Sequence, residues 1–387
     1  MSSAEASLDH SVAPVREFIL KIAARCNLNC DYCYEYQHGD ESWRSAGKFM
    51  LPAVYEEAAR KIAHHARQHG LEAVSISLHG GEPLLLGPNR LSRLAGTVRS
   101  IVESAGVALS LGIQTNGVLL SEEFAKVIRE HDIFVGISLD GNKSANDFHR
   151  LDHRGKSSYD RVIAGLRTLQ QFAPTHAAGV LAVVDARSDP IETLDALAAL
   201  GLPNVDLLLP HHNWDRPPVD GVSSDAAPYG RWLAKIWDAW LGGRHSHLRI
   251  RFLDNIVARL VGHPGLYEQM TTSPVQLVTI STDGDFEGVD TLKSTGSGVQ
   301  RTGLNVLRHE IDDVLSHPIY LMRQDWQATL PTACSHCRIK EICTGGYLPH
   351  RYSSRTGFNN RSVYCNDILH VVGHIERSVK DTVGATP

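Results

Sequence analysis

Three cysteines lie within eight residues near the start of the chain, between Arg25 and Tyr34. They are Cys26, Cys30 and Cys33, spaced C-x3-C-x2-C, and they follow an apolar run that predicts a strand. Thiolates this close in sequence can converge on one metal centre. On a cubane 4Fe–4S cluster they would leave one iron open to a substrate or cofactor, as an open position does on a catalytic zinc. Zinc itself is the alternative, with His38 as a fourth ligand.

Four more cysteines lie near the end of the chain, in an irregular, turn-rich stretch. They are Cys334, Cys337, Cys343 and Cys365, and no cysteine lies between the two groups. Four thiolates suffice for a closed cluster, and zinc is again the alternative. The division of the seven cysteines into three and four matches one open cluster and one fully ligated cluster.

Composition narrows the class of protein. The 387 residues suffice for two domains, or for one large domain with an appendage. A net charge of −5 gives no basic field for nucleic acid. No apolar stretch is long enough to span a membrane, and residues 1–15 have no apolar signal core. We therefore expect a cytoplasmic protein, where disulfides are uncommon and cysteines serve better as metal ligands. The 21 histidines are scattered, and we assign no metal to them.

Patterns typical of strands and helices alternate through the first 210 residues. Strands are predicted over 18–24, 74–78, 108–114, 133–139, 179–184 and 205–209, and helices over 52–69, 121–130, 158–172 and 190–200. Strands alternating with helices of this length indicate βαβ units and a parallel sheet. The count predicts an α/β barrel or an open part-barrel, in which chemistry sits at the C-terminal ends of the strands.

Polar, glycine-containing loops follow three of the predicted strands. They are His79-Gly80-Gly81-Glu82-Pro83, Gln114-Thr115-Asn116-Gly117 and Ser138-Leu139-Asp140-Gly141, with His149-Arg150 just downstream of the third. Paired glycines allow close backbone approach to a ligand, and a carboxylate can accept hydrogen bonds from an amine. Each loop alone is a weak signal that a simple turn would explain, but chance is a poor explanation for all three behind the cysteine motif.

The cysteine loop, with Tyr32 directly before the third cysteine, resembles the cluster motif of the radical AdoMet (radical SAM) enzymes. The resemblance covers about residues 16–215 and implies an open (β/α)6 partial TIM barrel. In that family the open iron binds the amino and carboxylate groups of AdoMet, and the reduced cluster cleaves it to methionine and a 5′-deoxyadenosyl radical. The resemblance implies Cys26, Cys30 and Cys33 as cluster ligands. It also implies these AdoMet contacts: Tyr32 near the adenine, Gly80, Gly81 and Glu82 at the amino group, Gln114, Asn116 and Ser138 around the ribose and carboxylate, and Arg150 at the carboxylate.

The C-terminal cysteines resemble the SPASM domain of radical AdoMet peptide maturases. The full pattern reads C-x2-C-x5-C-x3-C, with two more cysteines upstream and one downstream. Here Tyr347 and Val289 stand at two of the cysteine positions. The resemblance therefore implies that the auxiliary cluster nearer the active site is absent and that the outer one is retained on Cys334, Cys337, Cys343 and Cys365. Asp290 stands where some SPASM enzymes carry a catalytic base, although a surface carboxylate beside a turn is the alternative.

These patterns predict four regions. They are a flexible N-terminus over 1–15, a radical SAM partial barrel over 16–226, linking helices over 227–272 and a SPASM/twitch-like auxiliary iron–sulfur domain over 273–387. The stretch 210–227 is rich in proline, glycine, serine and aspartate and marks the end of the barrel. His211, His212, Asn213 and Trp214 follow the last barrel strand and are candidates to face the substrate.

The combination most resembles the cyclophane-forming radical SAM/SPASM maturases of the FxsB type. These enzymes act on a ribosomally made precursor peptide and join an aromatic ring carbon to the β-carbon of a nearby residue. The resemblance implies an electron donor such as flavodoxin or ferredoxin, and neither a nucleic-acid nor a membrane partner. Alternatives within the family are formylglycine formation of the sulfatase type and thioether crosslinking. The alternative from another class is a non-enzymatic adaptor that binds zinc at both cysteine groups.

Overall fold

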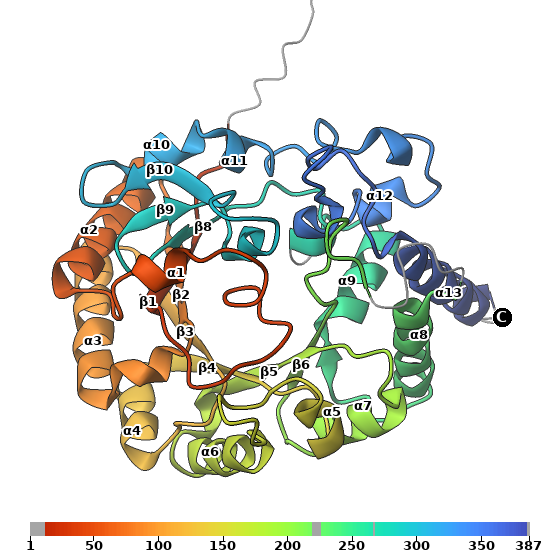
Figure 1. The fold of residues 1–387 in the computed structure, drawn as a ribbon, viewed down its shortest axis with the longest axis horizontal. Coiled ribbons are helices and arrows are strands. Elements are labelled where there is room, and N and C mark those ends of the chain that lie inside the picture. The colour runs from red at the N-terminus through yellow and green to blue at the C-terminus, as the bar shows by residue number, and fades with distance from the viewer. Residues whose placement is uncertain (1–11, 219–225, 266–267, 385–387) are drawn as a thin grey trace, which may run out of the picture.

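A single ten-stranded sheet organises the chain (Figure 1). The computed structural model describes residues 12–218, 226–265 and 268–384. The strand order is β10-β9-β8-β1-β2-β3-β4-β5-β6-β7, so the sheet has two free edges and is open. The strands are β1 (Glu17–Ala23), β2 (Ala73–Gly80), β3 (Ala108–Thr115), β4 (Ile133–Ser138), β5 (Ala177–Val183), β6 (Asn204–Leu208), β7 (Arg249–Ile250), β8 (Leu277–Ile280), β9 (Asp285–Glu287) and β10 (Arg301–Asn305).

Strands β1 to β6 form the predicted parallel part-barrel. Each pairs in parallel with the next along the chain, so all six end at the same edge of the sheet. Phe18, Leu20 and Ile22 on β1 are buried, and β2 buries alternate residues, as a half-covered strand requires. The loop after β1, which carries the first three cysteines, lies across the middle of the ring of helices in Figure 1.

Helices surround this sheet (Figure 1). Those of the barrel are α2 (Pro52–Gln68), α3 (Pro88–Ser104), α4 (Glu122–Glu130), α5 (Lys143–Asp147), α6 (Tyr159–Phe172) and α7 (Pro190–Ala198). Three of them have proline in the first turn, where its missing N–H costs nothing, and Ser121 caps α4. Helix α3 has no counterpart among the helices predicted above, although Leu91, Leu94 and Val98 recur at helical spacing and are buried.

The C-terminal region extends the barrel sheet instead of forming a sheet of its own. Strand β8 pairs in parallel with β1, and β8, β9 and β10 pair in antiparallel succession. Its helices are α8 (Pro228–Leu241), α9 (Arg251–Leu260), α10 (Ile311–Leu315), α11 (Pro318–Leu321), α12 (Lys340–Cys343) and α13 (Cys365–Gly384), while the short α1 (Ser42–Ser45) lies in the cysteine loop. Helix α13 packs against α8, whose Trp232 and Trp237 are buried. No helix within the described ranges has the length and hydropathy needed to cross a membrane.

The expected flexible N-terminus does not hold for residues 12–15. Val15 is fully buried, and the Ala13 carbonyl accepts a hydrogen bond of 2.8 Å from the Tyr320 hydroxyl. The Ala13 N–H also donates to the side chain of Gln324. These contacts tie the segment before β1 to the C-terminal region. The remainder of that prediction, residues 1–11, lies outside the described residues.

Candidate active site

The C-terminal ends of the parallel strands enclose a cavity of about 170 Å³. It is lined by all three cysteines of the first motif and by polar side chains that end β3 and β4. His211, a candidate to face the substrate, also lines it. The structure thus brings together almost every site residue predicted in the N-terminal half of the chain: Cys26, Cys30, Cys33, Tyr32, Gly80, Gly81, Gln114, Asn116, Ser138 and Arg150.

The three thiols lie in surroundings that disfavour ionisation without a cation. Burial and the neighbouring charges raise the pKa of Cys26 and of Cys33 to about 12, and burial also raises the pKa of Cys30. All three are free of disulfides. A metal cluster supplies the positive charge that offsets this cost, so the donor set fits a thiolate-bound cluster.

The proposed zinc ligand His38 does not join the three cysteines. It is not among the residues that line the cavity, and its Nε2 lies 3.2 Å from the Tyr32 carbonyl oxygen.

Glu82 lies behind the cavity wall. Its carboxylate is fully buried and accepts hydrogen bonds from the Thr115 hydroxyl at 2.7 Å and from the Asn116 N–H at 2.8 Å. The Leu84 N–H donates to it as well, at 2.9 Å. Burial raises the pKa of Glu82, and these three donors oppose that shift. Glu82 therefore braces the loops after β2 and β3, and it is the glycine pair before it that faces the cavity.

The glycine pair is required by packing against the cysteine loop. A Cβ on Gly80 would collide with the Ala23 carbonyl oxygen, and one on Gly81 with the Arg25 carbonyl oxygen. The Gly81 and Glu82 N–H groups donate to those same two carbonyls, each at 2.8 Å. The pair thus fixes the cysteine loop to the end of β2.

Polar side chains from β3 and β4 form one wall of the cavity. The Gln114 amide donates to the Ser138 hydroxyl at 2.8 Å. The Asn116 amide donates to the Asn27 side chain at 2.8 Å and lies 3.8 Å from the Cys26 sulfur. These contacts connect the two strand ends to each other and to the first cysteine.

A half-buried tyrosine, Tyr32, lies between a carboxylate and a guanidinium at another wall of the cavity. The Tyr32 hydroxyl donates to Asp140 at 2.6 Å and accepts from Arg150 at 2.8 Å. Burial raises the pKa of Asp140, and Arg150 opposes that shift. The Nε of Arg150 is buried without a hydrogen-bond partner. Asp140 is a residue that the sequence placed at a strand end but not in the site.

Asp290 is buried, so the surface-carboxylate alternative is wrong. Only 3% of the residue is exposed, and its carboxylate lies 2.6 Å from the Lys21 ammonium. The Tyr34 hydroxyl, which lines the cavity, donates to it at 2.6 Å. Burial alone would raise the pKa of Asp290, but Lys21 holds it well below its usual range, so the carboxylate is ionised. Asp290 itself does not line the cavity, and Tyr34 is a cavity-lining residue that hydrogen-bonds to it.

A buried charge network continues from this pair. Lys293 lies 2.6 Å from Glu35 and 3.6 Å from Glu287, and Lys21 lies 3.5 Å from Glu35. Sequence reasoning missed these groups. The available signal was Lys21 itself, a charged residue within an apolar strand.

The four C-terminal cysteines converge on one small cavity. Cys334, Cys337, Cys343 and Cys365 line it together with Ile339, Lys340, Arg361 and Leu369. Burial and the other three cysteines raise the pKa of the Cys343 thiol. This donor set also fits a thiolate-bound cluster.

Val289 and Tyr347, which stand where the SPASM pattern has cysteines, pack against neighbouring side chains. Val289 lies in an apolar cluster with Leu292, Ile319 and Leu348. The Tyr347 hydroxyl shares a hydrogen bond with the Thr291 hydroxyl.

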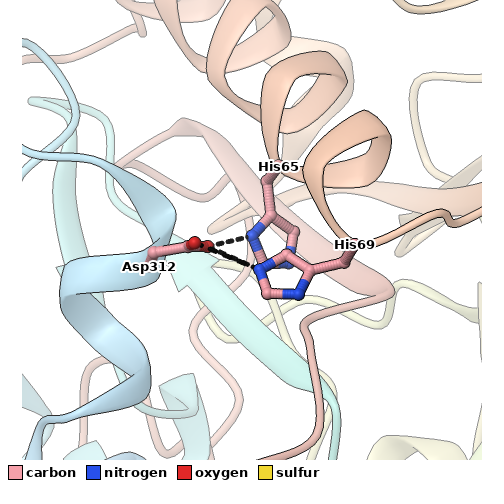
Figure 2. Close-up of side chains that lie close together, drawn as sticks. All are labelled: His65, His69 and Asp312. Atoms are coloured by element: carbon pink, nitrogen blue, oxygen red, sulfur yellow. Dashed lines mark hydrogen bonds and ion pairs between the residues drawn. The ribbon is translucent and has the colours of Figure 1, made fainter.

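One histidine cluster lies away from the cavity (Figure 2). His65 on α2 and His69 at its C-cap both contact the Asp312 carboxylate on α10, and Gln68 donates to it at 2.8 Å. The Val15 N–H donates to Nε2 of His65 at 3.1 Å, which leaves the proton on Nδ1, where it is donated to Asp312. A metal at Nδ1 would have to displace that arrangement, so we interpret the cluster as a hydrogen-bonded clamp between α2 and α10.

Comparison with known proteins agrees with this geometry. Residues 20–197 match the model of the radical SAM superfamily. The chain is 26% identical over 343 residues to a serine-type anaerobic sulfatase-maturating enzyme of Klebsiella aerogenes, covering 88% of this chain and 81% of that protein. It is 24% identical to a cysteine-type enzyme of Clostridium novyi (strain NT), covering 89% and 90%.

Two solved structures share the fold. Native anSMEcpe with bound AdoMet and Cp18Cys peptide gives a TM-score of 0.79 at 18% identity, covering 95% of this chain and 99% of that chain. Streptococcus suis SuiB bound to precursor peptide SuiA gives 0.62 at 17% identity, covering 92% and 77%. Residues 20–197 match the radical SAM superfamily, and the chain is an enzyme with a 4Fe–4S cluster and AdoMet as its cofactors.

Proposed function

We propose that the protein is a maturase that oxidises a ribosomally made precursor peptide and forms a cyclophane crosslink between an aromatic ring carbon and a nearby β-carbon. One observation carries the proposal. A cavity lined by Cys26, Cys30 and Cys33 connects through Tyr34 to a buried, ionised Asp290. The three cysteines therefore border the cavity directly, and a proton acceptor is reached from it through one hydroxyl group.

The reaction removes two hydrogens from the peptide. The bound cofactors supply the radical that removes the β-hydrogen as an atom. The ring hydrogen leaves as a proton, for which Asp290 is the acceptor and the Tyr34 hydroxyl the contact within the cavity. Lys21 keeps Asp290 ionised, so the carboxylate carries no proton of its own. Cys334, Cys337, Cys343 and Cys365 would hold an auxiliary 4Fe–4S cluster, which would supply an acceptor for the remaining electron.

The polypeptide orients the reacting groups and excludes water from them. Gln114, Asn116, Ser138 and Arg150 present donors and acceptors around the cavity, and Tyr32 is held between Asp140 and Arg150. Leu181, Val183 and Leu209 give it an apolar side that excludes water from the reacting groups. Flavodoxin or ferredoxin remains the predicted electron donor.

Formylglycine formation is the second candidate, favoured by the sulfatase-maturating relatives that align with nearly nine tenths of the chain. Oxidation of a serine to an aldehyde removes the same species from the peptide as the crosslink does: one hydrogen atom, one proton and one electron. Asp290 would then receive the hydroxyl proton. Loss of two hydrogens alone does not separate these products.

The decisive experiment is co-expression of the protein with a candidate precursor peptide encoded beside its gene, followed by fragmentation mass spectrometry. Loss of two hydrogens, confined to a segment that resists fragmentation between an aromatic residue and its partner, supports the crosslink. Loss of two hydrogens at one serine, with labelling by a hydrazide probe, supports formylglycine instead. If the peptide stays unmodified while deoxyadenosine is formed, the tested peptide is not the substrate.

A further inference from the structure

A second cavity of about 240 Å³ lies beside the first. It is bounded by the loop after β1, by α1 and by the β8–β9 hairpin. Glu35 and Tyr36 line both cavities and form the wall between them. A peptide whose reacting residue lies in the first cavity is therefore within a few residues of the second.

The outer wall of this second cavity is held in place by specific contacts. The Asp283 carboxylate accepts hydrogen bonds from the Gly47 N–H at 3.1 and 3.2 Å. The Arg25 guanidinium donates to the carbonyls of Trp43, Arg44 and Ala46. Both contacts fix the segment that contains α1 against the hairpin, so the cavity is a built feature of the fold.

The floor of the second cavity contains a buried carboxyl group, that of Glu287, whose pKa burial raises to about 7 although Lys293 opposes the shift. Glu287 is 4% exposed, and its Oε2 has no hydrogen-bond partner. The Lys293 ammonium lies 3.6 Å away but is closer to Glu35, at 2.6 Å. An incompletely paired buried carboxylate is costly, and a hydrogen-bonded cation relieves that cost.

The charges around Glu287 leave room for one more cation. Four carboxylates line the cavity, those of Glu35, Asp283, Asp285 and Glu287, against three cations, Lys21, Lys293 and Arg301. Lys21 is also paired with Asp290, which does not line the cavity. Asp283 and Asp285 are exposed at the rim, where they can guide a cation inward.

We propose that this second cavity binds a basic side chain of the substrate, an arginine or lysine a few residues from the residue that is modified. The guanidinium of arginine offers several donors in a planar fork, which suits Glu287 together with Asp285. The proposal relies on the proposed function only for the statement that the substrate is a peptide.

Equilibrium binding tests this without turnover. The probes are acetyl-Phe-Gly-Arg-amide and its citrulline counterpart, which keeps the shape of arginine and removes the charge. They are titrated into the full-length, cluster-loaded protein with AdoMet and no reductant. Because a charge-assisted hydrogen bond is worth about 1.5–3 kcal/mol, we expect the arginine peptide to bind at least about tenfold more tightly.

Variants test whether the difference in affinity between the arginine and citrulline peptides arises in the second cavity. Glu287→Gln should bring the two affinities within about twofold of each other. Arg301→Gln removes a like charge and should widen the gap. Glu72→Gln, at an exposed position on the surface, is the matched control and should leave the gap unchanged. If Glu287→Gln fails to fold, Asp285→Asn replaces it, with a smaller reduction of the gap expected.

Equal affinity of the two peptides for the unaltered protein would overturn the proposal. The cavity would then be a solvent-filled space that does not bind the substrate. A gap that survives both Glu287→Gln and Asp285→Asn would overturn it too. Failure of the proposed function has a different signature: the arginine preference persists while no peptide is modified.

Discussion

The two cysteine sites differ in what surrounds them. Cys26, Cys30 and Cys33 border a cavity with tyrosines, amides, an arginine and a route to Asp290. The C-terminal four border a small space whose other lining residues include Ile339, Leu369 and the cations Lys340 and Arg361, with no carboxylate. Three thiolates with an open side suit chemistry on a substrate, whereas four thiolates in a closed site suit electron transfer and structural support.

The largest effect should come from removing the open site. A Cys26→Ala, Cys30→Ala, Cys33→Ala triple variant should lose all deoxyadenosine production, because no thiolate then holds the reactive cluster. The reconstituted wild type should hold about eight irons per chain, as two four-iron clusters, and the variant about four. Chromatography of deoxyadenosine and iron analysis measure both. Normal deoxyadenosine from the triple variant would refute the assignment.

The closed site should fail differently. Cys343→Ala, combined with Cys334→Ala, should abolish peptide product while deoxyadenosine is still formed, because only the electron acceptor is removed. Iron should again fall to about four per chain. If this variant loses AdoMet cleavage while its circular dichroism stays native, the C-terminal site is not an electron acceptor alone. Stoichiometric zinc in the wild type would contradict both cluster assignments.

Asp290→Asn should separate proton removal from radical formation. Loss of a general base costs about 10²–10⁴-fold in product formation, while deoxyadenosine should be spared. Because Lys21 holds the pKa of Asp290 well below its usual range, the carboxylate stays ionised from pH 5 to pH 9, and product formation should show no step from this group there. Asp312→Asn, the same change far from the cavity, is the control. Full product from Asp290→Asn would remove it as the base.

The site residues that line the first cavity could be predicted from the sequence because they lie in one loop or at the ends of neighbouring parallel strands. The spacing of Cys26, Cys30 and Cys33 lies in one loop, and parallel strands bring Gln114, Asn116 and Ser138 to the same end of the sheet. Glu82 could not be placed this way. A motif read along the chain does not say whether a side chain points into the cavity or back into the protein, and here three internal donors hold it away.

The charge network could not be predicted for a different reason. Lys21 meets Asp290 because β8, far along the chain, pairs with β1. That pairing depends on a long-range choice of sheet edge, and the expectation of a separate C-terminal domain concealed it. The second cavity follows from the same pairing, since its walls come from the cysteine loop and the β8–β9 hairpin. Burial of a lysine in an apolar strand was the only local sign.

Tyr34→Phe tests the route from the open cavity to Asp290. The change removes the hydroxyl that donates to the carboxylate and leaves the ring in place against His211. One such hydrogen bond to a charged group is worth about 1.5 kcal/mol, so product formation should fall about tenfold with AdoMet affinity unchanged. Rapid-quench measurement of product and AdoMet titration check the two parts. An unchanged product rate would mean that Asp290 reaches the substrate without Tyr34.

The clamp of His65, His69 and Asp312 should give the smallest effect, and on stability alone (Figure 2). Asp312→Asn should lower the free energy of unfolding by about 1 kcal/mol, because it weakens the hydrogen bonds that join α2 to α10. Contacts with the two histidines lower the pKa of Asp312 against the effect of burial, so its contribution is present above its unfolded pKa and is lost as pH falls through the lower folded value.

Burial also lowers the pKa of His65, so protonation below about pH 6.5 favours the unfolded chain. Both shifts make stability fall on acidification. Asp312→Asn should weaken the more acidic part and, because Asp312 raises the pKa of His65 against burial, should steepen the part near pH 6.5. Thermal melts between pH 4 and pH 8 measure this, with zinc and with a chelator. Because the Val15 N–H already occupies Nε2 of His65, zinc should not raise the melting temperature; a rise that Asp312→Asn abolishes would make this cluster a third metal site.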